Sequence, residues 1–238
     1  MRAKRQALVL VPGMMCDERL FAPQSAHLSA GCDIWIPDIG RKASITELAQ
    51  EVLTSCPFPA FALCGLSMGG IVAMEMARQS PDRIERLALL DTNHLADAPE
   101  RHEIRNRQIS AARSGGFERV VAEEMMPFYF SAANKDDATL RGLVMAMARD
   151  VGARAFVNQS IALRDRNGAE DVVAAYARPM LVLCGAEDIV CPVSRHQAIS
   201  ALNRRAELRI VAAAGHLSTL EQPAHVNAAL ESWLTRKA

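Results

Sequence analysis

The sequence has no surplus of either charge, no long apolar run and no low-complexity segment. Among its 238 residues, 27 lysines and arginines stand against 27 aspartates and glutamates, so the formal net charge is zero. This balance gives no general attraction to nucleic acid or to an anionic membrane, and neither is expected as a partner. No stretch approaches the length that spans a membrane. Because half of the residues are hydrophobic, the composition fits one large globular domain, with or without an insertion.

The cysteines and histidines lack the spacing of a metal site. The six cysteines are scattered, mostly within or beside apolar runs, and we expect free, buried thiols in a reducing compartment. No histidine lies in a cluster with carboxylates at ligand spacing, so neither a metal nor another cofactor is expected. The apolar run at Ala7–Val11 is too short for a signal peptide, and we predict a cytoplasmic protein.

Short apolar runs alternate with helical patterns over most of the chain. This alternation is typical of a parallel sheet wrapped by helices, and it predicts an α/β fold with about six strands. Ser44, with Glu47 three residues later, forms a capping box that marks the start of one helix. The predicted strands cover residues 6–11, 33–36, 60–64, 83–90, 179–184 and 207–212, and the predicted core helices cover about 18–29, 44–55, 68–79, 194–202 and 223–235, with a further one ending near 177.

The alternation stops between residues 95 and 168. This segment has no strand pattern, only amphipathic helical stretches divided by Ser114-Gly115-Gly116, Pro127 and Gly152. It is short and enclosed by one fold on both sides. We therefore interpret residues 95–168 as an all-helical cap, inserted into a core made of residues 1–94 and 169–238.

A glycine-flanked serine stands between a predicted strand and a predicted helix. The run Ala60–Cys64 leads into Gly65-Leu66-Ser67-Met68-Gly69, and a helical pattern begins at once. Such a sharp turn strains the serine backbone, and side chains two residues away on either side would clash. The turn exposes the serine hydroxyl above the sheet edge and aims the next amide, at the positive end of a helix, toward an attacked carbonyl. The alternative is a tight turn with an incidental serine.

A serine hydroxyl is nearly inert without a base, and that base needs a carboxylate to fix its tautomer. Both partners should follow later strands, because functional loops of an open parallel sheet gather beyond its carboxyl ends. Asp188 comes just after the strand that ends at Cys184, and His216 follows the strand that ends near Ala212. The chain order is therefore serine, acid, histidine.

This arrangement resembles that of the α/β-hydrolase superfamily, in which the nucleophile, acid and histidine come in this order. The segments G-A-E-D-I-V-C-P and A-G-H-L-S-T-L-E-Q-P are similar to the acid and histidine loops of its esterase-like members. The resemblance covers the chain outside residues 95–168, where the family carries a variable cap. It implies an α/β-hydrolase fold, with Ser67 as nucleophile, His216 as general base and acid, and Asp188 as the orienting carboxylate.

The same resemblance assigns the oxyanion hole to the backbone amides of Met14 and Met68. Many family members have a histidine before the glycine of this loop, whereas this chain has Pro12 before Gly13. A backbone donor is not affected by that change. The usual first two strands of the family have no counterpart before residue 6, so we expect an all-parallel sheet that is shortened at one edge.

Several nearby side chains offer alternatives. Asp91 also ends a strand, and some superfamily members take the acid from this position; otherwise it would bond to nearby loop amides. Glu187 lies beside Asp188. His94 could lie at the mouth of the pocket, but a solvated loop position is expected. The remaining histidines fall on predicted helices as surface or packing residues: His27, His102, His196 and His225.

The predicted cap carries an apolar, sulfur-rich set and a series of arginines. Most of the apolar set is expected to pack the cap on the core, while one or two members line an acyl pocket. The arginines are expected to form a solvated helix face rather than an anion site. The apolar set comprises Met125, Met126, Phe128, Tyr129, Phe130, Met145 and Met147, and the arginines are Arg101, Arg105 and Arg107.

The predicted activity is hydrolysis of a small or medium carboxylic ester through an acyl-enzyme. The same three residues could instead hydrolyse a thioester, a lactone or a carbon–carbon bond, or support perhydrolysis or acyl transfer, because the fold does not determine the reaction. A protein of another class, which binds a ligand and turns over slowly or not at all, is the further alternative. In each case the partner is a small molecule, and the oligomeric state is not predicted.

Overall fold

The computed structural model describes residues 5–236 and is built around a sheet of six parallel strands. The strand order is β2-β1-β3-β4-β5-β6, so the all-parallel sheet predicted from the sequence is confirmed. The strands are β1 (Gln6–Val11), β2 (Cys32–Trp35), β3 (Phe61–Leu66), β4 (Ile84–Leu90), β5 (Met180–Gly185) and β6 (Ala206–Val211). The order of the strands reverses between β1 and β3, and in such sheets ligands bind beyond the carboxyl ends at this point.

The central strands are buried on both faces. Leu8 and Leu10 pack in a cluster on one face, while Val9 and Val11 pack in a second cluster on the other face. Every residue of β3 is likewise buried. Double burial explains why the strands appear in the sequence as continuous apolar runs rather than as alternating patterns.

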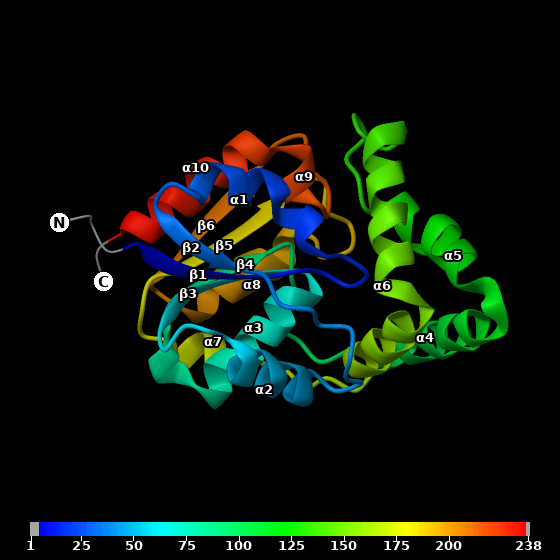
Figure 1. Cartoon of the computed structure of the whole chain (residues 1–238), viewed down its shortest axis with the longest axis horizontal. Helices are drawn as coiled ribbons and strands as arrows, with labels where there is room; N and C mark the ends of the chain where they lie inside the picture. Colours follow the sequence, from blue (N-terminus) through cyan, green and yellow to red (C-terminus); the bar gives the residue numbers. More distant parts are fainter. Residues whose placement is uncertain (1–4, 237–238) are drawn as a thin grey trace.

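Helices cover the two faces of the sheet (Figure 1). The helices α2 (Ile45–Ser55), α3 (Met68–Gln79), α7 (Glu170–Ala175) and α8 (Val193–Leu202) lie on one face, and α1 (Ala22–Leu28) and α10 (Pro223–Thr235) lie on the other. The capping box at the start of α2 is confirmed in its first half, since the Ser44 side chain accepts a hydrogen bond from the Glu47 amide.

The segment between β4 and α7 is helical and projects to one side of the sheet (Figure 1). It contains α4 (Pro99–Ala111), α5 (Phe117–Arg119) and α6 (Ala138–Arg164), with π-helical stretches η3 (Ala112–Gly116) and η4 (Val120–Met125) and a 3-10 turn η5 (Met126–Phe128). Gly152 has a φ of 87° and kinks α6. We call this segment the cap; the division at residues 95 and 168 stays a prediction.

The structure differs from the sequence-based expectation at four short elements. Strand β3 continues to Leu66, because its last residues still pair with β4. The helix expected over residues 18–29 is a 3-10 turn, η1 (Glu18–Phe21), followed by α1. A 3-10 turn, η2 (Pro81–Arg83), and the one-turn helix α9 (Ser218–Glu221) were not predicted. Within residues 5–236, no helix combines the length and the apolar character needed to cross a membrane.

Candidate active site

Ser67 occupies a strained turn between β3 and α3. Its backbone lies at φ 54° and ψ −117°, a conformation that costs a non-glycine residue about 1–3 kcal/mol. The flanking glycines make the turn possible. A Cβ on Gly65 would lie 2.2 Å from the Gly69 carbonyl oxygen, and a Cβ on Gly69 would lie 2.0 Å from the Val11 carbonyl oxygen. The need for glycine at both positions, expected from the motif, is thus confirmed.

Hydrogen bonds to β4 and to the residues that follow it hold the turn in place. The Ser67 amide donates to the Leu90 carbonyl at 2.9 Å, and the Thr92 hydroxyl donates to the Ser67 carbonyl at 2.6 Å. The Thr92 amide in turn donates to Nε2 of the buried His196 at 2.8 Å. Gly70 must remain small, because a Cβ there would lie 2.6 Å from the Thr92 hydroxyl. These contacts with neighbouring segments therefore hold Ser67 in its strained conformation.

The structure brings Ser67, His216 and Asp188 into one hydrogen-bonded chain. His216 Nε2 lies 2.8 Å from Ser67 Oγ, and His216 Nδ1 lies 2.9 Å from Asp188 Oδ2. Asp188 and His216 are each 3% exposed, whereas Ser67 is half-buried and lines a cavity. The other Asp188 oxygen accepts the amides of Val190 and Cys191 at 2.9 and 2.8 Å. These two amides fix the carboxylate so that its second oxygen faces the imidazole.

The two alternative acids have other partners. Asp91 accepts the Gly185 amide at 2.9 Å and the Ser218 hydroxyl, in keeping with its expected role as an acceptor for loop amides. Burial, and next the charge of Asp188, raise the pKa of Asp91 well above its usual range. Glu187 accepts the Ala132 amide at 2.8 Å. The hydrogen-bond partner of His216 Nδ1 is Asp188.

A buried glutamate fixes the loop that carries His216. Glu221 accepts the Gly215 amide at 2.7 Å and, with its second oxygen, the Ser131 amide at 2.8 Å. The His216 amide donates to the Tyr129 carbonyl at 2.8 Å. The cap residues around Tyr129 therefore lie against this loop, and the position of the imidazole depends on the cap as well as on β6. The motif A-G-H-L-S-T-L-E contains Glu221, but nothing in the sequence indicates the cap as its partner.

The two predicted oxyanion donors lie at the same cavity: Met14 comes from the loop after β1, and Met68 from the start of α3. Met14 and Met68 line the cavity together with Ser67. Met15 adopts a φ of 58°, and its amide donates to the buried Gln159 side chain of α6 at 3.0 Å. Met68 is the first residue of α3, where helix amides have no internal acceptor and the helix dipole favours negative charge. The roles of the Met14 and Met68 amides stay a prediction.

The cavity beside Ser67 has a volume of about 320 Å³, near the lower end of the range for small-molecule sites. Five of the ten residues between 95 and 168 that line it are apolar or aromatic, and the other five are three arginines, Gln108 and Glu124. Of the apolar set predicted in the cap, Met125, Phe128 and Tyr129 line the cavity, and Met126, Phe130 and Met147 are buried in a core cluster.

Two expectations from the sequence are wrong. His94 is not solvated, because it is only 4% exposed and lies in a separate small hollow between the core and the cap. Arg105 does not belong to a solvated helix face: it is 9% exposed, pairs with Asp97 and lines the cavity. Whether a residue is exposed depends on which other segments pack over it, and the sequence around His94 and Arg105 does not show that. His196 packs in the core, as expected.

The thiols are free, and all but that of Cys56 are buried, as expected. Within residues 5–236, one group has a spacing that could hold a metal ion: the donor atoms of Asp188, Cys191 and His216 lie within 4.8 Å of one another. Two of these donors already bond to each other, and burial, followed by the charge of Asp188, raises the pKa of the Cys191 thiol. A metal needs deprotonated ligands, so this chemistry favours proton transfer over metal binding.

A serine on a strained strand-to-helix turn, with a histidine and a carboxylate after later strands of a parallel sheet, is the arrangement of an α/β hydrolase. The comparison with known families agrees: residues 8–229 match the model described as the alpha/beta hydrolase family, and the chain belongs to this family. The α/β-hydrolase fold and the family resemblance predicted from the sequence are thereby confirmed.

Individual relatives are hydrolases of different substrates. Pimeloyl-(acyl-carrier protein) methyl ester esterase from Edwardsiella ictaluri (strain 93-146) is 26% identical over 243 residues, covering 96% of this chain and 93% of that protein. The structure of a thermophilic esterase from Thermogutta terrifontis, solved with malate bound, has a TM-score of 0.89 at 26% identity, covering 98% of this chain and 90% of that one. An enol-lactonase from Burkholderia xenovorans LB400 has a TM-score of 0.85 at 22% identity, covering 99% and 94% of the two chains, which shows the shared fold alone.

Proposed function

We propose that the chain is a serine hydrolase that cleaves a small or medium carboxylic ester through an acyl-enzyme. The observation that carries the proposal is the hydrogen-bonded chain from Ser67 Oγ through His216 to Asp188, with contacts of 2.8 and 2.9 Å. The esterase relatives described above support the ester as substrate, and the cavity of about 320 Å³ supports a small one.

The proposed reaction begins when Ser67 Oγ attacks the ester carbonyl while His216 Nε2 takes its proton. Asp188 accepts the Nδ1–H of the imidazole, so it selects the tautomer that has a free Nε2 lone pair and stabilises the imidazolium. The amides of Met14 and Met68 stabilise the oxyanion, and losing one such donor lowers turnover by about a hundred- to a thousand-fold. His216 then protonates the leaving alcohol, and the same base activates the water that releases the acid.

A panel of p-nitrophenyl esters of increasing acyl length, with a matched thioester and a lactone, tests this function. The wild-type chain should hydrolyse the short esters, and Ser67→Ala should lower kcat by up to about 10⁶-fold, because the residual rate relies on binding and the oxyanion hole. Ser110→Ala is the matched control, since Ser110 is exposed on α4. Ester turnover in Ser67→Ala equal to that of the control would refute the nucleophile assignment. A thioester or lactone preferred over every ester would correct the substrate class.

A further inference from the structure

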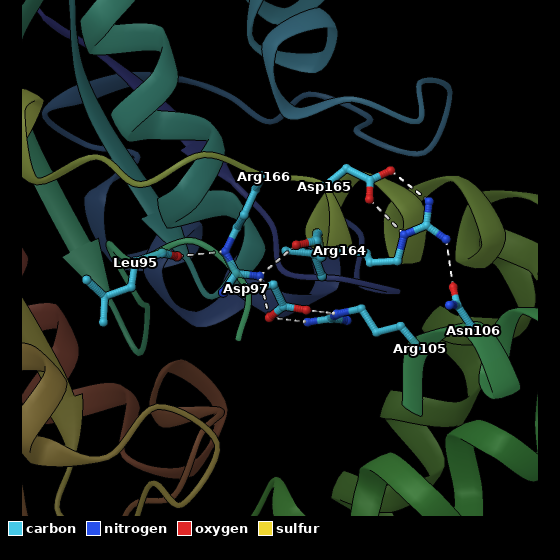
Figure 2. A network of polar contacts seen from close by, with 8 residues as sticks. Leu95, Asp97, Arg105, Asn106, Arg164, Asp165 and Arg166 are labelled. Carbon is cyan, nitrogen blue, oxygen red and sulfur yellow. Dashed lines mark hydrogen bonds and ion pairs between the residues drawn. The ribbon is translucent and has the colours of Figure 1, made fainter. Parts of the chain in front are cut away.

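Two arginines share one buried carboxylate at the wall of the cavity (Figure 2). Arg105 of α4 lies 2.5 Å from Asp97 through Nε, and Arg166, just after α6, lies 2.9 Å from the other Asp97 oxygen. The side chains are 11%, 5% and 1% exposed for Arg105, Arg166 and Asp97. Arg166 also donates to the Leu95 carbonyl at 2.9 Å. The cluster therefore joins the loop after β4 to both long cap helices.

The cluster keeps an uncompensated positive charge. Burial raises the pKa of Asp97, but the hydrogen bond and charge of Arg105, followed by the charge of Arg166, outweigh it and lower the pKa below the usual value. Asp97 is therefore ionised near neutral pH, and guanidinium groups are always charged. Two cations face one anion in a place with little water, where a net charge is costly unless another group pairs with it.

Both guanidinium groups have donors to spare. Among the hydrogen bonds that involve residues 5–236, none engages Arg105 Nη1 or Arg166 Nη2. Arg105 and Arg166 both line the cavity that contains Ser67. A charged donor that lines a cavity and has no protein acceptor can bind a ligand oxygen there, so this wall of the cavity can bind an anion.

A third arginine adds to the positive charge. Arg101 lies one helical turn before Arg105 on α4 and lines the same cavity, and within the described part of the chain it makes no ion pair. The acidic residue of the lining is Glu124, which accepts a hydrogen bond from Gln108 at 3.2 Å. Asp188 is held by His216 and two backbone amides. The cations of the wall therefore outnumber the anions that could neutralise them.

Apolar side chains also line the cap side of the cavity, among them Ile104, Met125, Phe128 and Leu163. We propose that the substrate is an ester that also bears a carboxylate, which Arg101 and the free donors of Arg105 and Arg166 bind while a short apolar spacer contacts this wall. The inference rests on the proposed function, because it places the scissile carbonyl at Ser67. Arg101, Arg105 and Arg166 then determine specificity and take no part in bond cleavage.

Two pairs of neutral and charged esters test the inference. Monomethyl glutarate and the methyl ester of glutaric acid monoamide differ at the acyl end, and para-acetoxybenzoate and para-acetoxybenzamide differ on the alcohol side. Within each pair the shape is closely matched, and a charged carboxylate stands in place of a neutral amide. In at least one pair, kcat/KM for the carboxylate should exceed that for the amide by about tenfold or more, as expected for a charge-assisted hydrogen bond. The pair that shows the preference identifies the side of the ester that carries the carboxylate.

Substitution of the arginines links the preference to this wall. Arg101→Gln should lower the carboxylate-to-amide ratio of kcat/KM by about fivefold or more. Arg107→Gln, at an exposed position of the same helix that does not line the cavity, should leave the ratio unchanged. Arg105→Lys keeps the charge but loses the planar set of donors, so it should lower the ratio while thermal unfolding reports any structural loss separately.

The outcomes separate this inference from the proposed function. If both amide esters are cleaved in a Ser67-dependent manner and neither carboxylate is preferred, the ester hydrolase stands and the inference is refuted. If no ester is cleaved, binding of monomethyl glutarate and its amide to the Ser67→Ala variant is compared by calorimetry. Tighter binding of the carboxylate, lost in Arg101→Gln, supports the anion site. Equal binding of the carboxylate and the amide would refute the anion site and leave the arginines only a structural role, joining the cap to the core.

Discussion

The choice between Asp188 and Asp91 can be decided by two asparagine substitutions. In Asp188→Asn, the amides of Val190 and Cys191 still require an oxygen where Oδ1 now accepts them at 2.9 and 2.8 Å. The new NH₂ group must then face His216 Nδ1, which lies 2.9 Å from the carboxylate oxygen it replaces. A donor at this position forces the imidazole into the tautomer that carries its proton on Nε2, so it cannot accept the proton of Ser67.

The expected loss from Asp188→Asn is about 10³- to 10⁴-fold in kcat, which corresponds to about 4–5.5 kcal/mol of transition-state stabilisation. In Asp91→Asn the change should be small, because burial and the charge of Asp188 raise the pKa of Asp91 and so already disfavour its charged form, which a neutral amide can replace. Its amide oxygen can keep the Gly185 contact of 2.9 Å. This variant should retain kcat within about tenfold of the wild type.

The assay is the kcat for a short p-nitrophenyl ester at neutral pH, with circular dichroism to show that both variants are folded. A large loss in Asp91→Asn together with near-normal turnover in Asp188→Asn would refute the reasoning and assign the acid to β4 instead of β5. Comparable losses in both variants would mean that the two carboxylates act as one unit.

Two further predictions concern stability. Gly69→Ala should lower the free energy of unfolding by about 3 kcal/mol or more, because its Cβ would meet the Val11 carbonyl oxygen at 2.0 Å. Gly142→Ala, whose Cβ would have nothing within 4 Å, should raise the free energy of unfolding by about 0.5–1 kcal/mol. Equal urea midpoints for the two variants would contradict this. Burial lowers the pKa of His196 in the folded chain from 6.5 to about 4. As the pH falls below 6.5, the unfolded chain is therefore protonated before the folded one. The stability that neutral His196 provides above pH 6.5 is lost as the pH falls toward 4. His196→Gln should remove up to about 3 kcal/mol of that decline, and urea unfolding curves of the two proteins that fall in parallel with pH would disprove the assignment.

The sheet and the serine turn could be predicted because their signals are local. The apolar runs are long enough to define each strand, and the two glycines beside Ser67 are adjacent in sequence to the strand and helix that require them. The positions of Asp188 and His216 follow from a rule of topology, since loops after parallel strands share one edge of the sheet. These inferences need no knowledge of how the cap is placed.

The residues that sequence reasoning missed interact across long stretches of chain. The Gln159 side chain accepts a hydrogen bond from the Met15 amide 144 residues away, and the ion pair of Arg166 with Asp97 spans 69 residues. Such contacts depend on where the cap helices rest on the core, and helical periodicity alone contains no information on that placement. For the same reason Arg105, one of several arginines on a polar helix, was expected in solvent.

The most direct test of the account is the rate at which a fluorophosphonate probe labels Ser67, measured by mass spectrometry of the labelled peptide. The account predicts rapid labelling of Ser67 in the wild-type chain and labelling slowed by about a thousandfold or more in His216→Asn, because the base that activates the hydroxyl is lost. A folded wild-type chain that does not react, that reacts at another residue, or that reacts no faster than His216→Asn would contradict it.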